Sequence, residues 1–299
     1  MHDLIIIGAG PAGLTAAVYA ARYKMDQRII TREVGGTAAT ADTVCNFPSY
    51  DRIKGFELMQ KMSAQVEKLS VPITYDGVSS ITRSNDHFII TTENGDHYES
   101  RKVLYCAGTV HNKLHIPGEE EFLGRGVSYC ATCDGAFYKN KTVAVIGGSD
   151  AALTAALLLS EFATKVSIIY RKDKFLRAEP AWVEAVEKES KITALFNTEI
   201  SQIHGARVVT GVQLNTGSML SVDGVFIEIG STPKTDLLGG LGVALDKGYV
   251  VVNTQMESTV QGFYAAGDVV NHELKQIVTA CSDGATAVYA IYHALKKSQ

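Results

Sequence analysis

The sequence predicts an α/β fold with two Rossmann-like, dinucleotide-binding domains of the three-layer ββα type, the second inserted into the first. Two segments support this prediction, because each has a short β-branched run, a glycine-rich turn and an alanine-rich helix. One begins at Leu4 and the other at Val143. The final strand and helix, after Gly262, have no such turn, so we expect the chain to return to the first domain there.

Length and composition fit two compact domains. The chain has 299 residues, 46% of them hydrophobic and 20% charged, as in ordered globular proteins. A net charge of -4 with scattered Lys and Arg residues argues against a nucleic-acid partner. Glycines and a proline interrupt the apolar run 4–21, so no membrane span is expected, and residues 1–3 lack the basic start of an export signal. We therefore expect a cytoplasmic protein.

The first segment contains the motif Gly8-Ala9-Gly10-Pro11-Ala12-Gly13 between a strand and a helix that extends to about Tyr23. Its glycines suit a tight turn, a close approach of pyrophosphate and close packing of helix on strand. A second strand, 28–31, completes a βαβ unit. Glu33 follows where an acidic side chain would bind a ribose hydroxyl. The segment predicts dinucleotide binding.

The remaining patterns define the expected domains. Residues 73–107 alternate apolar and polar side chains around an Asn94-Gly95 turn, which predicts an antiparallel meander, and 200–229 form a second such run. The second segment has strands at 143–146 and 166–170, and the tail has a strand at 262–268 and a helix from about 275 to 296. We expect one domain from 1–115 with 243–299 and an inserted domain from 116–242.

Cys130-Ala131-Thr132-Cys133 is the candidate redox site. Five cysteines, an odd number, do not form a disulfide framework, and such a pair in a reducing compartment is redox-active or binds metal. A zinc site would need a second ligand pair, but the other three cysteines are isolated in the sequence, so no metal is expected. A dithiol that forms a reversible disulfide explains the pair, and Asp134 is placed to exchange a proton with it.

Gly267-Asp268 ends the apolar strand of the tail. By itself the pair would be a polar strand terminus. Together with the N-terminal glycine motif, an aspartate at a strand's carboxyl end lies at the crevice where such folds bind cofactors. Asp268 is therefore a candidate ribityl or phosphate ligand.

These residues resemble the low-molecular-weight thioredoxin reductases, a class of FAD-dependent pyridine nucleotide-disulfide oxidoreductases. The resemblance extends along the whole chain. Its motifs are Gly8 to Gly13, Gly35-Gly36 before Asn46-Phe47-Pro48, Cys106-Ala107-Gly108-Thr109, Ile116-Pro117-Gly118-Glu119, Cys130 to Gly135, and Gly262 to Val269 with Lys275-Gln276.

The resemblance implies a homodimer with FAD in the first domain, NADPH in the second, and a thioredoxin-like protein as electron acceptor. The implied FAD residues are Gly8, Gly10, Pro11, Ala12, Gly13, Glu33, Gly36, Thr37, Asn46, Ala107, Gly108, Gly267, Asp268, Lys275 and Gln276. The implied NADPH residues are Gly147, Ser149, Asp150, Ala151, Arg171, Lys172 and Arg177.

The resemblance also implies a mechanism. A hydride reduces the flavin, the flavin reduces the disulfide through Cys133, and Cys130 attacks the disulfide of the partner. Asp134 donates and accepts the proton. The inserted domain rotates between two arrangements, and we expect its hinges at 116–118 and 239–242.

The sequence departs from the family most clearly in the second glycine turn. Ser149 replaces the glycine that faces the pyrophosphate, and its β-carbon obstructs a close approach. Tyr170-Arg171-Lys172 replaces a histidine and two arginines, and Arg177 comes one residue late. Cations at a strand end still favour NADP over NAD, and the alternative is a solvated basic loop.

Smaller departures lie near the flavin. Thr37, Cys45 and Lys275 replace the Gln, Glu and Arg that are common in the family. We interpret Cys45 and Cys106 as small buried hydrophobic residues rather than redox groups. These changes are expected to tune the flavin without abolishing its binding.

The leading hypothesis is an NADPH-dependent thioredoxin-disulfide reductase. A first alternative keeps the flavin and the dithiol but uses ferredoxin or a deazaflavin as donor, or acts as a dithiol oxidase with oxygen. Ser149 and the shifted Arg177 favour it. A second alternative is a flavin-binding redox sensor without turnover, and Asp134 argues against it because a sensor needs no proton exchange.

Overall fold

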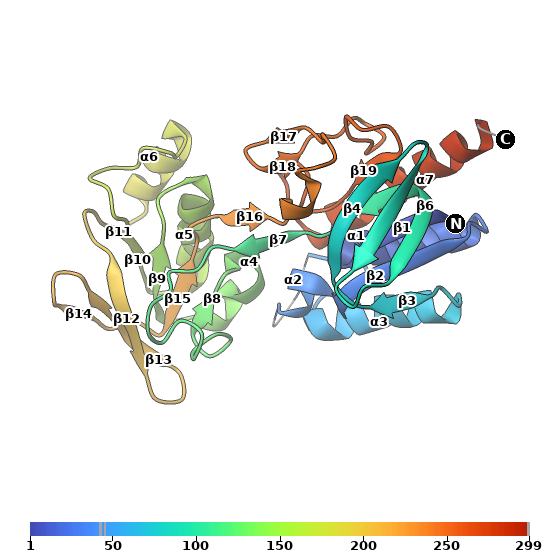
Figure 1. The fold of residues 1–299 in the computed structure, drawn as a ribbon. Coiled ribbons are helices and arrows are strands. Elements are labelled where there is room, and N and C mark those ends of the chain that lie inside the picture. The colour runs from blue at the N-terminus through green and yellow to red at the C-terminus, as the bar shows by residue number, and fades with distance from the viewer. Residues whose placement is uncertain (42–43, 45, 298–299) are drawn as a thin grey trace. The chain divides into compact units, whose positions relative to one another are not determined.

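The computed structural model describes residues 1–41, 44 and 46–297 (Figure 1). These residues divide into two compact units, Met1–Val110 with Thr232–Gln299, and His111–Ser231. The second unit is therefore an insertion in the first. No helix in the described part of the chain combines the length and hydropathy that a membrane span requires.

The first unit is built on one seven-stranded sheet in the order β3-β2-β1-β6-β5-β4, with β19 also paired to β6. Strands β1, β2, β3, β6 and β19 pair in parallel through the links β1–β2, β2–β3, β1–β6 and β6–β19. The elements of this sheet and its helices are β1 (His2–Ala9), α1 (Pro11–Arg22), β2 (Gln27–Val34), α2 (Gly36–Ala39), α3 (Gly55–Lys68), β3 (Ile73–Tyr75), β4 (Val78–Ser84), β5 (His87–Thr92), β6 (His97–Tyr105), β19 (Phe263–Ala265) and α7 (Ile277–Lys297).

The meander expected over 73–107 is only partly correct. Strands β4, β5 and β6 pair antiparallel, with Gly95 at a φ of +90° in the turn between β5 and β6. At the two ends of this run, however, β3 pairs in parallel with β2 and the second half of β6 pairs in parallel with β1. The end of β6 is apolar and buried at Val103, Leu104 and Tyr105, as expected for a central parallel strand.

The second unit has a five-stranded parallel sheet in the order β11-β10-β9-β15-β8. A separate antiparallel sheet contains β12, β13 and β14. The elements of this unit are β8 (Val127–Ser128), α4 (Ala131–Asp134), the 3-10 helix η1 (Gly135–Tyr138), β9 (Thr142–Ile146), α5 (Asp150–Phe162), β10 (Lys165–Ile169), α6 (Pro180–Lys188), β11 (Ile192–Leu195), β12 (Ile200–Gly205), β13 (Val209–Leu214), β14 (Met219–Leu220) and β15 (Gly224–Ile227).

The antiparallel run expected over 200–229 extends too far along the chain, because the antiparallel strands end with β14. Strand β15 leaves the meander and pairs in parallel with both β9 and β8. Its residues Val225, Phe226 and Ile227 are all buried, so the strand has apolar contacts on both faces rather than one. A continuous apolar run of this kind indicates a central parallel strand.

The chain crosses between the units in the short strands β7 (Thr109–His111) and β16 (Ser231–Pro233), which pair with each other. These crossings lie earlier in the chain than the expected boundaries at 115/116 and 242/243. Gly118 belongs to the second unit, where Ile203 N–H donates to Pro117 O at 2.9 Å. Leu238 belongs to the first unit and is buried in its core with Ile5 and Ile7. Tertiary packing thus places the glycine-rich segment 238–242 in the first unit.

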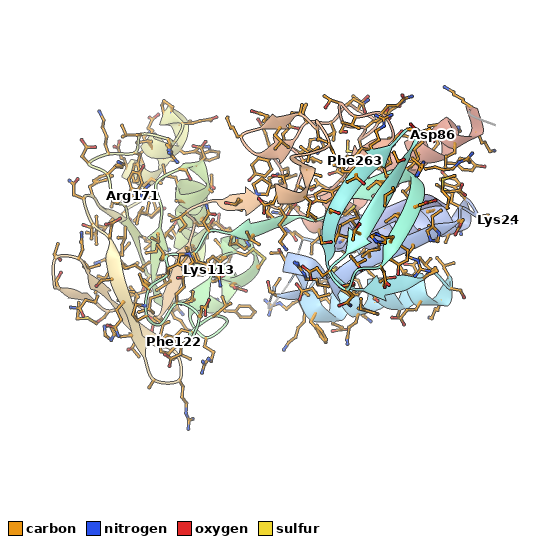
Figure 2. All side chains as sticks on the ribbon, viewed as in Figure 1. Lys24, Asp86, Lys113, Phe122, Arg171 and Phe263 are labelled. Atoms are coloured by element: carbon orange, nitrogen blue, oxygen red, sulfur yellow. A yellow bond between two sulfur atoms is a disulfide. The ribbon has the colours of Figure 1, made fainter. Side chains whose placement is uncertain are left out.

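The remaining elements of the first unit follow the second crossing. They are the 3-10 helix η2 (Asp236–Leu238), β17 (Leu245–Asp246) and β18 (Tyr249–Val250). Helix α7 packs along α1, and a β-carbon at Gly284 would lie 2.2 Å from Ala12 O, so glycine is needed for this close approach. Each unit has its own buried side chains, such as Phe263 in the first and Phe122 in the second (Figure 2).

Candidate active site

Four neighbouring parallel strands of the first unit end at one edge of its sheet. The glycine turn 8–13 follows β1, Glu33 lies at the end of β2, Ala107-Gly108 follows β6, and Gly267-Asp268 follows β19. Carboxyl ends of adjacent parallel strands form the crevice in which open α/β sheets bind ligands. The structure thus brings these predicted residues to one edge.

The glycines of the first turn are needed for two different reasons, packing within the fold and access for a ligand. A β-carbon at Gly8 would lie 2.4 Å from Cys106 O, and one at Gly13 would lie 2.0 Å from Gly8 O. Among the described residues, no heavy atom lies within 4 Å of the place that a β-carbon at Gly10 would take. Packing therefore explains two glycines, and the third faces open space that a ligand can approach.

The N-terminus of α1 fits a pyrophosphate group. Gly10 is its N-cap, Pro11 follows at the first helical position, and no described side chain caps the first turn. The free backbone N–H groups and the positive end of the helix dipole then face an anion. Glu33 is exposed at the end of β2, as a ribose ligand must be.

Other predicted flavin residues meet across long sequence distances. Asn46 Nδ2 donates to Gln276 Oε1 at 2.9 Å, and Thr37 Oγ1 donates to Thr109 O at 3.4 Å. Gly36 has a φ of +53° at the start of α2. Cys106 is buried, and burial raises the pKa of its thiol, which fits a packing role. Cys45 lies outside the described residues.

Lys275 lies beside Asp268 at the same edge. Lys275 Nζ donates to the carbonyl oxygens of Asp268 at 3.0 Å and Val270 at 2.8 Å, and it lies 4.1 Å from the centre of the Tyr249 ring. Burial raises the pKa of Asp268, and the nearby Lys275 opposes that shift. Burial lowers the pKa of Lys275, and Asp268 opposes that shift in turn.

Asp283, which the sequence patterns did not predict, supports this turn from α7. It is 8% exposed, and its carboxylate accepts a hydrogen bond from Gly267 N–H at 3.1 Å. His272 Nδ1 lies 3.5 Å from the same carboxylate. Burial raises the pKa of Asp283 and the Gly267 N–H opposes the shift. An aspartate on the otherwise apolar buried face of α7 is the signal that could have revealed it.

In the second unit, Cys130 and Cys133 form a disulfide with their Cα atoms 5.3 Å apart. Cys130 comes two residues after Ser128, the last residue of β8, and is the N-cap of α4. Because β8 runs parallel to β15, the disulfide lies at the carboxyl edge of the second sheet. The glycine turn after β9 lies at this edge as well.

Ser128 connects Asp134 to the disulfide. The Ser128 hydroxyl donates to Asp134 Oδ2 at 2.6 Å. Ser128 Oγ also accepts a hydrogen bond from Cys130 N–H at 3.0 Å. Ser128 is 4% exposed, so this contact is shielded from water. The arrangement places a carboxylate, through one hydroxyl, beside the cysteine backbone, where it can donate or accept a proton. Ser128 was not predicted; a serine two residues before a Cys-x-x-Cys motif is the available signal.

Glu119 fixes the segment before the disulfide. It is 1% exposed and accepts hydrogen bonds from Leu114 N–H at 2.9 Å, His115 N–H at 2.7 Å and Tyr129 Oη at 2.7 Å. The Tyr129 ring stacks on His111 with ring centres 5.2 Å apart. Across the described residues, no three His, Cys, Asp or Glu side chains are arranged to hold a metal ion.

The second glycine turn differs from the first. Gly147 has a φ of +147°, and a β-carbon at Gly148 would lie 2.5 Å from the Tyr170 ring. Ser149 has a β-carbon where Gly10 has open space, so the backbone is less accessible to a pyrophosphate. Asp150 Oδ1 accepts from Glu179 N–H at 2.7 Å, and Ala151 is exposed in the first turn of α5.

One predicted cation lies at this turn, and two others follow the neighbouring strand. Arg177 forms a parallel β-bridge with Ser149, so its late sequence position does not remove it from the turn. Arg171 and Lys172 follow β10, the strand next to β9, and both are exposed; Figure 2 labels Arg171 on the second unit. The structure therefore keeps Arg177 beside Ser149, while the second turn lacks a glycine at the position that Gly10 occupies in the first.

A sequence model described as pyridine nucleotide-disulphide oxidoreductase matches residues 2–284 of this chain. The chain belongs to this family. It is 39% identical to the thioredoxin reductase of Bacillus subtilis (strain 168), with 100% of this chain and 96% of that protein aligned. It is 42% identical to the thioredoxin reductase of Treponema pallidum (strain Nichols), with 97% and 95% aligned.

Solved structures agree with these sequence matches. The crystal structure of thioredoxin reductase from Streptococcus pyogenes superposes with a TM-score of 0.91 at 36% identity, covering 99% of both chains. The predicted resemblance to thioredoxin reductases and the predicted α/β fold with two dinucleotide-binding domains are therefore confirmed.

Proposed function

We propose that this chain is a thioredoxin-disulfide reductase, in which electrons pass through FAD and the Cys130–Cys133 disulfide to a thioredoxin-like protein. The observation on which the proposal rests is the disulfide itself, linked through Ser128 to the Asp134 carboxylate. Relatives at 39% and 42% identity that are named thioredoxin reductases support it.

The first unit would hold FAD. The N–H groups at the start of α1 and the open face of Gly10 suit the pyrophosphate, Glu33 suits a ribose, and Asp268 suits the ribityl chain or a phosphate. Bound FAD would supply the two electrons that reduce the disulfide. Asp283 holds the Gly267 backbone, and Lys275 offsets the charge of Asp268.

The cysteines and Asp134 would then carry out thiol–disulfide exchange. The Cys130 thiolate attacks the partner's disulfide, forming a mixed disulfide and releasing one partner sulfur as a thiolate. Cys133 attacks Cys130 Sγ, which re-forms the Cys130–Cys133 bond and frees the second partner sulfur. Asp134, held by the Ser128 hydroxyl, gives and takes the protons of these sulfurs.

NADPH is the proposed electron donor, supported by the cations Arg171, Lys172 and Arg177 around the second turn. Ser149 favours a second candidate, an enzyme of the same kind that takes electrons from ferredoxin or a reduced deazaflavin, because its β-carbon narrows the pyrophosphate approach. By analogy with the family, we propose a homodimer in the cytoplasm, with light scattering as the test of assembly.

Anaerobic titration of the yellow holoprotein tests the donor and the acceptor together. We expect NADPH to bleach the flavin absorbance and oxidised thioredoxin to restore it. Bleaching by a reduced deazaflavin or ferredoxin but not by NADPH would replace the proposed donor with the second candidate. Failure of thioredoxin to restore absorbance after any bleaching would refute the reductase function.

Two cysteine variants test the order of the thiols. Cys133→Ser should accumulate a mixed disulfide between Cys130 and thioredoxin, because the second attack is lost. Cys130→Ser should accumulate none, and the opposite pattern would reverse the assignment. Mass spectrometry of the non-reduced adduct provides the measurement, and Cys281→Ser is a control outside the pair.

A further inference from the structure

Glu228 directly follows β15 and touches the glycine turn of the second unit. Its N–H donates to Ile146 O at 2.8 Å, and a β-carbon at Gly147 would lie 2.3 Å from its carbonyl oxygen. In the sheet order β11-β10-β9-β15-β8, the chain adds β10 and β11 on one side of β9, whereas β15 lies on the other side. The order of the strands therefore reverses between β9 and β15. Glu228 therefore lies at the carboxyl end of a strand at the topological switch point, where such sheets bind ligands.

Glu228 lies next to the redox motif. β15 pairs in parallel with β8 with Phe226 opposite Ser128, and Glu228 and Cys130 follow these two residues by two positions each, at the same edge of the sheet. Burial raises the pKa of Glu228 to about 7, and the Ala131 N–H opposes that shift. The carboxyl group next to the cysteine backbone therefore changes its charge near neutral pH.

Several titratable groups lie on the elements around Glu228. His111 is one of them, because its neighbour Asn112 donates to Ile229 O at 3.2 Å. Helix α4 and its N-cap contribute Cys130, Cys133 and Asp134, and α5 contributes Asp150 at its start. The two carboxylates have their own donors, the Ser128 hydroxyl for Asp134 and Glu179 N–H for Asp150. The cysteine pair is thus the neighbour whose charge changes with redox state, because a disulfide is neutral and a thiolate is negative.

We propose that Glu228 is a positioning residue that takes up a proton when the Cys130–Cys133 disulfide is reduced. The proposal rests on the redox function proposed above. Two electrons break the S–S bond, one proton binds one cysteine, a second proton binds the Glu228 carboxylate, and the other cysteine remains a thiolate. When a partner disulfide reoxidises the pair, both electrons and both protons go to the partner's sulfurs.

This arrangement has a chemical advantage for exchange. A thiolate beside an ionised carboxylate would be destabilised by like charge, whereas a protonated Glu228 removes that repulsion. The attacking sulfur is then kept as the nucleophilic thiolate near neutral pH. Asp134 and Glu228 thereby differ in role, since Asp134 is linked to the Cys130 N–H through the Ser128 hydroxyl, whereas Glu228 follows β15, the strand paired with β8.

The test measures the redox equilibrium of the full chain with dithiothreitol between about pH 6 and pH 9, with thiols trapped by alkylation and counted by mass spectrometry. At each pH, the equilibrium constant for reduction of the wild-type protein is divided by that of Glu228→Gln. If reduction raises the Glu228 pKa by one unit, this ratio should fall about tenfold as pH rises across the range. Asp223→Asn is the matched control. Asp223 lies just before the opposite end of β15 and binds Thr142 N–H, so this variant should keep the wild-type profile.

Infrared difference spectroscopy supplies a second readout that does not depend on activity. Reduction of the wild-type protein near neutral pH should add the band of a protonated carboxyl group, and Glu228→Gln should lack it. If the wild-type protein and Glu228→Gln have parallel pH profiles and the same carboxyl band, the proposed role of Glu228 is wrong. The proposed reductase function would be unaffected by that result. If the wild-type pair does not equilibrate with dithiothreitol, both proposals fail.

Discussion

Substituting the glycines of the first turn separates folding from flavin binding. Gly10 has a φ of -76° and faces open space, so Gly10→Ala meets no described atom and should change the stability of the flavin-free protein by less than about 1 kcal/mol. A β-carbon at Gly13 would lie 2.0 Å from Gly8 O and 3.3 Å from Ile6 Cγ2. Because Gly8 O is a backbone atom of a fixed turn, Gly13→Ala should cost at least about 3 kcal/mol.

The flavin affinities should show the complementary effect. The new methyl group of Gly10→Ala occupies the space through which a pyrophosphate approaches, and a steric cost of about 1–3 kcal/mol corresponds to a roughly five- to 150-fold weaker affinity. Thermal unfolding of the flavin-free proteins and FAD titration followed by flavin fluorescence measure the two effects. Wild-type affinity in Gly10→Ala, or wild-type stability in Gly13→Ala, would refute the assignment of these glycines.

Three further predictions concern the second unit. Ser149→Gly should tighten NADPH binding about tenfold, measured by the NADPH dependence of flavin bleaching, and no change would mean that its β-carbon is not an obstacle. Ser128→Ala leaves Cys130 N–H without its acceptor and should slow reduction of thioredoxin about tenfold in stopped-flow assays, with the thermal midpoint as control. The pKa of Glu228 is about 7 in the folded protein, against 4.5 for an ordinary glutamate in the unfolded chain. The folded state therefore binds the proton more tightly, and the free energy of unfolding of the oxidised protein should fall by about 3 kcal/mol as pH rises from about 4.5 to 7. Glu228→Gln should lose that fall in denaturant titrations.

The parts of the fold that sequence analysis predicted are those encoded in contiguous segments. The run from β1 through α1 to β2 has its strand, glycine turn and helix within the first 34 residues, so local patterns suffice. The Cys130–Cys133 pair is equally local, and its disulfide is present in the structure. The glycine turn and the cysteine pair are therefore predictable from local sequence alone, whereas the tail strand expected over 262–268 is only Phe263–Ala265.

The parts that escaped prediction depend on partners far away in the sequence. Strand β8 has two residues, Val127 and Ser128, too few for any periodicity, and it exists because it pairs with β15. The segment 238–242 has the glycines of a linker, yet Leu238 is 2% exposed in the first unit's core. Helix α6, Pro180–Lys188, buries only Val186, so its apolar stripe is too weak to stand out in the sequence.

In each unit the candidate site lies at the carboxyl edge of its parallel strands, but the two edges have different side chains and therefore different chemistry. In the first unit the carboxyl ends of β1, β2, β6 and β19 surround a turn whose Gly10 is open to a ligand. In the second unit the corresponding position is Ser149, and the neighbouring strands β8 and β15 end in the disulfide and in Glu228. Because Glu228 touches the Gly147 turn and follows the strand that pairs with β8, a ligand bound at that turn acts on the same residue that responds to the dithiol. A nucleotide that displaced the Glu228 backbone would therefore change the pH dependence of the cysteine pair, and repeating the dithiothreitol equilibrium with saturating NADP+ measures that coupling. A profile unchanged by NADP+ would show that the turn and the disulfide act independently.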